Sequence, residues 1–207
     1  KGFCRTNLFK RLESCGYGFI LSVERHILRN YIFLHAIQND LPMPIGTQDM
    51  GLLDSRINDS DSDLFDTGDD DNNDNGGDIV TSTLRTEADF KKRAAEVYDT
   101  YAKQFRRRFK WLRSDLFDEL LAEDVKRDAK SLITVLRACG DWDSARDAKL
   151  KALIELLTKT HPKDKVLVFT QFADTVDYLE NRLNAAGIKA LAGVTGDSAN
   201  PTGDAWR

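Results

Sequence analysis

Cysteine and histidine are scarce in this sequence, and neither residue type is grouped. Three of each occur among 207 residues, and their spacing matches no zinc-binding or disulfide pattern. No apolar run approaches the roughly 18 residues that a membrane-spanning helix needs. Apolar residues make up 41% of the chain and charged residues 31%, which is typical of soluble globular proteins. We therefore expect a cytoplasmic protein with reduced thiols.

The 207 residues also contain no recognisable phosphate-binding or catalytic motif. A Gly-x-x-x-x-Gly-Lys-Ser/Thr loop would cradle phosphates and an Asp-Glu-x-His run would hold magnesium, but neither is present. No nucleophile with a neighbouring base and no pair of carboxylates stands out. The sequence therefore predicts no catalytic, cofactor-binding or metal-binding residue in this chain.

Most of the negative charge lies in one segment. The net charge is −4, and residues 54–78 hold ten Asp and one Arg, a net of −9, so the other 182 residues carry +5. Residues 54–83 offer little to bury, which predicts a disordered acidic linker. An alternative interpretation is a calcium loop, because residues 71–76 alternate oxygen-bearing side chains before a glycine. The twelfth position of that loop is Ser82 rather than the glutamate that an EF-hand uses.

Residues 1–53 are predicted to be a mainly helical segment. Apolar side chains recur three or four positions apart through residues 4–38, which indicates a helix with one buried face. Gly16 and Gly18 interrupt this pattern and predict a break or a bend. Residues 40–55 contain two prolines and are predicted to form an irregular connector.

Residues 84–162 are predicted to form a hairpin or bundle of antiparallel helices at 84–110, 115–138 and 144–160. The residues expected to cap or end these helices are Thr83 or Thr86, Ser114, Gly140 and Pro162. The apolar stripes of the helices are interpreted as core. They include Phe90, Ala94, Val97, Tyr101, Phe105, Phe109, Leu116, Leu120, Leu121, Val125, Leu132, Val135 and Leu136.

Residues 163–207 are predicted to begin a parallel sheet. Residues 165–172 have the continuous apolar character of a strand that is covered on both faces. Helical spacing follows over residues 173–186, Gly187 predicts the end of that helix, and residues 188–191 form a second short strand. Strand, helix and strand in this order indicate a parallel β-α-β unit. The predicted fold class is mostly α with a small parallel α/β portion.

Several blocks of this last segment resemble a known family. The blocks are residues 165–172 (Lys-Val-Leu-Val-Phe-Thr-Gln-Phe), 178–180 (Tyr-Leu-Glu), 187–188 (Gly-Ile) and 193–196 (Gly-Val-Thr-Gly). Together they resemble the opening of the second RecA-like lobe of superfamily-two helicases, in particular bacterial Swi/Snf-type ATPases. Two upstream blocks, residues 8–14 and 147–150, resemble segments of the same family and occur in the same order.

This resemblance implies an internal piece of a larger ATP-dependent DNA translocase. Residues 1–53 and 84–162 would belong to the helical region between two motor lobes, and residues 163–207 would begin the second lobe. The implied cofactors of the intact protein are ATP and Mg²⁺. The implied partners are duplex DNA and the remaining lobes of the same polypeptide. The chain alone is expected not to hydrolyse ATP, and the open edges of its short sheet are expected to favour self-association.

A basic stretch is the first candidate for nucleic-acid contact. Residues 85–113 hold ten Lys or Arg against four acidic residues, and the densest cations are Arg106, Arg107, Arg108 and Lys110. Basic residues interleaved with aromatics suit phosphate contact and base stacking. Cations at a helix end also complement the helix dipole, so both interpretations remain open.

Two turns near the C-terminus are the second candidate. The loop after residues 165–172 enters a helix N-terminus, where free N–H groups attract phosphate. In the resembling family this edge faces the nucleic-acid backbone, which makes Thr170 and Gln171 candidate contacts. Gly196 belongs to a glycine-containing turn that would let the backbone approach a phosphate closely. Both turns are equally consistent with ordinary connections between a strand and a helix.

Two further alternatives concern the helical parts. The basic residues of the first segment are Lys10, Arg11, Arg25 and Arg29. They form either a solvated face or a relay between motor lobes. The second hypothesis for the whole chain is a non-enzymatic module in which the helices over 85–138 bind a protein partner. Salt-dependent DNA binding favours the translocase, and a tight complex without DNA favours the module.

Overall fold

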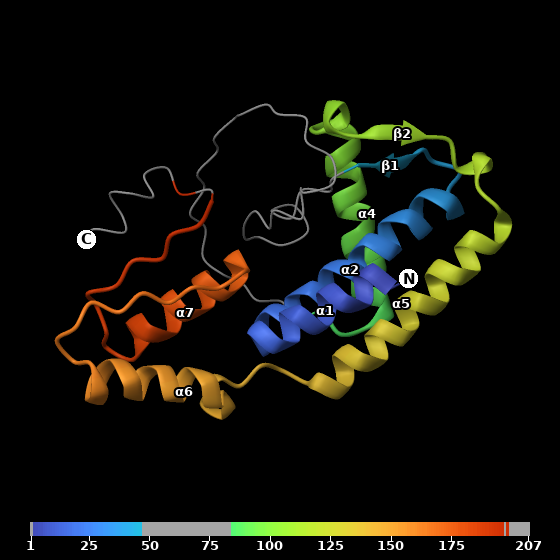
Figure 1. Ribbon diagram of the computed structural model, residues 1–207. Coiled ribbons are helices and arrows are strands. Elements are labelled where there is room, and N and C mark those ends of the chain that lie inside the picture. The colour runs from blue at the N-terminus through green and yellow to red at the C-terminus, as the bar shows by residue number, and fades with distance from the viewer. Residues whose placement is uncertain (1, 47–83, 197, 199–207) are drawn as a thin grey trace. The chain divides into compact units, whose positions relative to one another are not determined.

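The computed structural model describes residues 2–46, 84–196 and 198 (Figure 1). These residues are mostly helical, in line with the sequence, and they include a short two-stranded antiparallel sheet. No helix among them is long and apolar enough to cross a membrane. The predicted acidic linker and the alternative calcium loop lie outside the described residues. The chain divides into unit 1, Lys1–Ser22 with Asp141–Arg207, and unit 2, Val23–Gly140.

Helices α1 (Gly2–Ser14) and α2 (Gly16–Gln38) follow each other with a break at Cys15. The predicted interruption near Gly16 is therefore confirmed. A larger residue would clash at this position, because a Cβ on Gly16 would lie 2.4 Å from the ring of Trp142. Glycine thus allows Trp142 to pack against the start of α2.

In unit 2, helix α4 (Glu87–Lys103) begins with a capping box at Thr86. The Thr86 hydroxyl accepts a hydrogen bond from the N–H of Asp89 at 3.2 Å. The Asp89 carboxylate accepts one from the N–H of Thr86 at 3.0 Å. These two bonds satisfy donors that are left unpaired at a helix start. Thr86 is therefore the cap, one of the two residues that the sequence predicted.

The predicted helix over 84–110 is wrong beyond the end of α4. Arg106–Arg108 form a 3₁₀ turn, η2, and Lys110–Leu112 form strand β2. The buried ring of Phe109 packs on Tyr101 with ring centroids 4.5 Å apart. A continuous helix would carry Phe109 about 12 Å further along its axis than Tyr101. The chain therefore folds back after α4, and ring packing overrides the helical pattern.

Strand β1 (Met43–Ile45) pairs with β2 in an antiparallel register that places Pro44 opposite Trp111. Figure 1 shows the two strands side by side. The predicted irregular connector over 40–55 is therefore wrong for β1. Proline is compatible with an edge strand, since it has no N–H to donate to a further strand.

Helix α5 (Glu119–Cys139) is capped by Asp118, whose carboxylate accepts a backbone N–H at 2.9 Å. The prediction of Ser114 as the cap is wrong, because that residue begins a separate 3₁₀ turn, η3 (Ser114–Leu116). Gly140 ends α5 with a φ of 65°, the left-handed conformation that favours glycine. This part of the prediction is confirmed.

The face of α5 that packs inward carries Ala129, Ile133 and Leu136. Leu116 and Leu120 were predicted as core, but they are 68% and 63% exposed. Leu120 lies nine residues before Ala129, which places it on the opposite side of a helix with 3.6 residues per turn. Leu116 precedes the helix altogether, so the apolar pattern of α5 does not apply to it.

The core of unit 2 forms where α2, α4 and α5 meet. Tyr31 of α2 stacks on Phe90 of α4, with ring centroids 6.0 Å apart and planes 11° apart. Arg85 pairs with Glu24 at 2.7 Å and so connects the start of α4 to α2. The largest of the side chains with less than 2% exposure are Tyr31, Tyr101, Phe90, Ile27, Leu28, Ile32, Leu136, Val23 and Pro44.

Unit 1 places four short elements after Gly140. They are the 3₁₀ turn η4 (Ser144–Arg146), helix α6 (Ala148–Glu155), the π-helical turn η5 (Leu156–Thr160) and helix α7 (Ala173–Ala185). The first three together span the predicted helix over 144–160. Gly187 follows α7 with a φ of 87°, so its predicted role as a helix stop is confirmed.

Tyr178 of α7 lies at the centre of the unit 1 core, which it shares with Cys15, Leu150 and Leu183. Its hydroxyl accepts from the indole N–H of Trp142 at 3.1 Å and donates to the carboxylate of Asp147 at 2.9 Å. Burial raises the pKa of the Tyr178 hydroxyl, so this group stays protonated and keeps the bond to Asp147.

The described residues do not show the predicted parallel β-α-β unit. Residues 165–172 and 188–191 form no assigned strand, although α7 lies between them as expected. Within the apolar run, Leu167, Val168 and Phe169 are 67%, 51% and 89% exposed. A strand needs a hydrogen-bonded neighbour, and no described segment pairs with this run.

Candidate nucleic-acid interface

The arginine segment, defined as Arg106, Arg107, Arg108 and Lys110, lies on η2 and β2 of unit 2. All four side chains are exposed, whereas Phe109 between them is 6% exposed. The segment therefore alternates between cations that face solvent and an aromatic residue that faces the core.

Aromatic contacts hold the arginine segment on α4. Trp111 meets Phe109 at 6.0 Å and Tyr98 of α4 at 5.8 Å, both edge to face. The indole N–H of Trp111 donates to the carbonyl oxygen of Arg106 at 2.7 Å, which closes the turn. The Tyr98 hydroxyl donates to the carbonyl oxygen of Pro42 at 2.7 Å, next to β1. The backbone that carries the cations is thus fixed from two sides.

Three of the four cations have no ion pair within the part of the chain that the structure describes. Arg106, Arg107 and Lys110 form no ion pair with any residue that the structure describes. The guanidinium of Arg108 lies 5.1 Å from the ring centroid of Phe105, which is a cation–π contact. Burial and Asp99 raise the pKa of the Tyr98 hydroxyl, and the positive charge of Arg106 partly offsets this effect.

The helix-dipole interpretation does not account for this cluster. Helix α4 ends at Lys103, and the dipole's effect falls off within the last turn of a helix. Arg107, Arg108 and Lys110 lie four to seven residues beyond that end. Their shared feature is exposure on a fixed backbone, which is the arrangement that contact with an external anion requires.

Thr170 and Gln171 lie in unit 1. The sequence predicted them as nucleic-acid contacts in the loop after residues 165–172. The half-buried Thr170 hydroxyl lies 3.3 Å from the hydroxyl of Ser14, which also lies 3.1 Å from that of Thr175. Thr170 is therefore engaged within the unit. Gln171 is exposed and is the member of this loop that remains accessible.

The N-terminus of α7 contains a buried ion pair. Arg11 of α1 donates to the carboxylate of Asp174 at 2.9 Å, and both side chains are less than a tenth exposed. The guanidinium of Arg11 also lies 4.6 Å from the ring centroid of Phe172. A carboxylate thus occupies the first turn of α7, where the sequence predicted that phosphate could bind. The interpretation of Arg11 as part of a solvated face is wrong, and so is that of Arg25, which is 3% exposed.

The glycine-containing turn over residues 193–196 packs against α7 at its first residue. The N–H of Gly193 donates to Glu180 of α7 at 3.2 Å, and a Cβ on Gly193 would lie 2.7 Å from the same carboxylate. Glycine is required there because the chain passes close to α7. Gly196, the predicted contact, is exposed, and a Cβ there would meet nothing within 4 Å.

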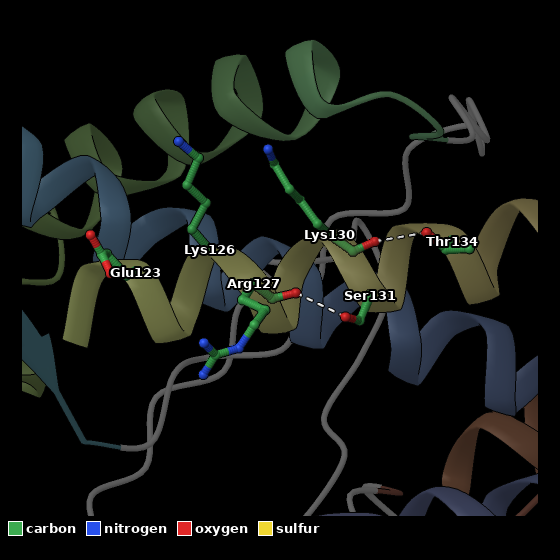
Figure 2. A pocket seen from close by; sticks show the side chains of 6 residues that line it. All are labelled: Glu123, Lys126, Arg127, Lys130, Ser131 and Thr134. Carbon is green, nitrogen blue, oxygen red and sulfur yellow. Dashed lines mark hydrogen bonds between the residues drawn. The ribbon is translucent and has the colours of Figure 1, made fainter. Parts of the chain in front are cut away.

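A groove along α5 in unit 2 has a volume of about 410 Å³ (Figure 2). It is lined by Glu123, Lys126, Arg127, Lys130, Ser131 and Thr134. All six side chains come from a single helix, and the two hydroxyls donate to carbonyl oxygens of the same helix at 3.0 Å. Nothing converges on a ligand in this groove, so we do not assign it a site.

The arginine segment is therefore the candidate that the structure assembles best. No group of three His, Cys, Asp or Glu side chains in the described part of the chain could hold a metal ion. Comparison of the sequence and structure with protein-family models, curated proteins and solved structures found no match. Function is accordingly inferred from the chain's own geometry and from the family resemblance of its sequence.

Proposed function

We propose that this chain contacts the phosphate backbone of duplex DNA through the arginine segment. The observation that carries the proposal is the exposure of four cations within five residues on a backbone fixed by buried aromatic rings. Cations that neutralise phosphates release condensed counterions, which drives binding without any dependence on base sequence. Fixing the backbone in advance reduces the entropy lost when the complex forms.

The aromatic residues favour contact with phosphates over stacking with bases. Phe109 is buried, and the half-buried ring of Trp111 contacts Tyr98 and Phe109. The rings that could stack on an unpaired base are therefore used inside unit 2. Backbone contact suits a duplex, in which the bases are stacked on each other and the phosphates are exposed.

The larger role that we propose is that of a segment of an ATP-dependent DNA translocase. It rests on the Swi/Snf-type resemblance of residues 165–172, 178–180 and 193–196, and the helix stop at Gly187 is compatible with it. In such a motor, ATP and Mg²⁺ would bind to other lobes of the polypeptide. Gln171 and Gly196 would contribute DNA contacts from the second lobe, and Thr170 would support the loop through Ser14.

Replacing Arg106, Arg107 and Arg108 with alanine is expected to weaken binding to duplex DNA by about tenfold or more at low salt, because three phosphate contacts are lost. The measurement is fluorescence anisotropy of a labelled duplex titrated with the whole chain. The loss should be the same for duplexes of different sequence, since the segment reads no bases.

The matched control removes the same amount of charge from unit 1. Arg146, Lys151 and Lys163 are exposed, and their triple replacement with alanine lowers the net charge equally. Only a small effect on DNA affinity is expected from this control. Equal losses in the two triple variants would mean that net charge alone drives binding, and the proposed interface would then be wrong.

A second candidate function is protein binding, and exposed leucines favour it. Leu112, Leu116 and Leu120 are 41%, 68% and 63% exposed and follow one another along β2, η3 and α5. Replacing Leu116 and Leu120 with serine separates the two candidates. DNA binding should persist in this variant if the arginine segment is the interface. A stable complex that requires both leucines and survives nuclease treatment would favour the protein-binding module.

A further inference from the structure

The chain crosses between the two units at two places. Unit 2 (Val23–Gly140) is inserted into unit 1, so the chain enters it once and leaves it once. The first crossing, Ser22–Val23, lies inside helix α2, and the second crossing, Gly140–Asp141, lies directly after α5. Relative motion is the usual behaviour of two units of one chain. Any such motion has to be absorbed by the backbone at both crossings.

Arg85 ties the two crossings together on the unit 2 side. Its guanidinium donates to the carboxylate of Glu24 at 2.7 Å, just after the first crossing, and to the carbonyl oxygen of Gly140 at 3.5 Å, at the second. The Nε of Arg137 in turn donates to the carbonyl oxygen of Arg85 at 3.0 Å. The bond to Glu24 is charge-assisted and its two side chains are each 21% exposed, so it is stronger than a bond in full contact with water. The chain therefore enters and leaves unit 2 at one fixed place.

Trp142 has the equivalent role on the unit 1 side. This residue follows the second crossing, and its ring packs against Gly16, the first residue of α2. Its indole N–H donates to the hydroxyl of Tyr178 at 3.1 Å, and the two rings meet edge to face with centroids 6.1 Å apart. Both crossings are thus also held together within unit 1. The stretches that lie between the attachments at Arg85 and Trp142 are residues 17–23 of α2 and residues 140–141.

Helix α2 is weakened within this stretch. Glycine at position 18 is less favourable in a helix than alanine. The Ser22 hydroxyl donates to the carbonyl oxygen of Gly18 at 2.8 Å, and a serine that bonds back by four residues favours a bend. Gly/Ser pairs are among the recognised causes of helix kinks. Packing does not require this glycine, since a Cβ there would lie 3.8 Å from Asp174 and 3.9 Å from Cys15, which are ordinary contacts. What Gly18 supplies is therefore a helix that bends easily.

The second crossing also permits bending. A Cβ on Gly140 would meet nothing within 4 Å, and glycine adopts a wide range of φ and ψ at little cost. We propose that unit 2 turns relative to unit 1 about a hinge with two points, residues 18–22 of α2 and Gly140–Asp141. Hinges consist of a few residues that absorb changes in φ and ψ. Because Arg85 and Trp142 keep the two points together, the motion is a rotation about one axis. The inference does not depend on the proposed DNA contact, since it uses different residues.

Distances between two spin labels, measured by pulsed electron paramagnetic resonance on the whole chain, test this hinge. One label is attached at Lys151→Cys in unit 1 and the other at Lys92→Cys in unit 2, both of which are exposed positions. Cys4 and Cys139 are replaced with serine so that they take up no label. The labelled parent should give a broad distribution of distances. A single narrow distance in the parent would overturn the proposal.

Stiffening α2 should narrow this distribution. Gly18→Ala combined with Ser22→Ala is expected to lower the population of bent helix by about fivefold, the factor by which alanine is favoured over glycine in a helix. The matched control is Gly196→Ala combined with Ser131→Ala. Gly196 lies in open space, and Ser131 bonds back by four residues within α5, so the control should keep the parent's distribution. An unchanged width in the α2 variant, or equal narrowing in the control, would overturn the hinge.

Removing the tie between the crossings should have the opposite effect. Arg85→Ala is expected to broaden the distribution, because the two points of the hinge then move independently. An unchanged width in this variant would overturn the single axis of rotation. If Arg85→Ala unfolds unit 2, which hydrogen exchange of the α4 amides reveals, the α2 variant decides the question.

Discussion

Replacing Phe90 with alanine is expected to lower the free energy of unfolding of unit 2 by about 3–5 kcal/mol. Phe90 is fully buried and stacks on Tyr31, so the change removes a large apolar surface and leaves a cavity between α2 and α4. Hydrogen exchange of the α4 amides, followed in the whole chain, measures the loss within this unit.

The control for this prediction is an exposed phenylalanine. Phe169 in unit 1 is 89% exposed, and Phe169→Ala is expected to change stability by less than about 0.5 kcal/mol. An equal effect of both substitutions on α4 would show that the packing of α2 on α4 does not stabilise unit 2.

The second large effect is expected at the buried ion pair of unit 1. Asp174→Ala leaves the Arg11 guanidinium, 5% exposed, without the carboxylate that pairs with it at 2.9 Å. Loss of one partner from a buried pair costs about 3–5 kcal/mol, because the remaining charge stays desolvated. The expected result is a matching loss of hydrogen-exchange protection in α7.

A double variant and an exposed pair complete this test. Arg11→Met combined with Asp174→Leu removes both charges and should recover most of the stability. Glu155 pairs with Lys159 at 2.8 Å, but these side chains are 62% and 72% exposed, so Glu155→Ala should cost less than about 1 kcal/mol. If the double variant were less stable than Asp174→Ala, an unpaired buried charge would not be the cause of the loss. The packing of the two side chains would then be what stabilises unit 1 at this position.

Helices and their ends were predictable because the signals that set them are local. Thr86 and Asp89 are three residues apart and satisfy each other's N–H groups. Gly140 and Gly187 end helices because they adopt a positive φ, which is also a property of the residue itself. Such features depend on neighbours in the sequence, so pattern reasoning reaches them.

Strand pairing was not predictable, because it depends on distant partners. Each strand of the observed sheet has only three residues, and β1 contains a proline. The two strands pair because Phe109 folds back onto Tyr101. Local sequence patterns do not predict this contact. Conversely, residues 165–172 have the composition of a strand, but composition does not supply a neighbouring strand.

The cationic residues of the candidate interface were predictable from the sequence. Which neighbouring side chains face solvent and which face the core was not. The sequence identified the cations of the arginine segment, but it suggested base stacking by aromatic residues that the structure buries. Thr170 was expected to face a ligand, whereas its hydroxyl contacts Ser14, 156 positions earlier in the chain.

The measurement that tests the proposed DNA contact most directly is the salt dependence of binding. The slope of log K against log salt counts phosphate contacts, at about 0.9 for each contact with duplex DNA. If the arginine segment is the interface, the slope for the variant with Arg106, Arg107 and Arg108 replaced by alanine should be less steep than that of the parent by about 2.7. The unit 1 control should keep the parent's slope. Parallel lines for the parent and the arginine variant would contradict the proposed function.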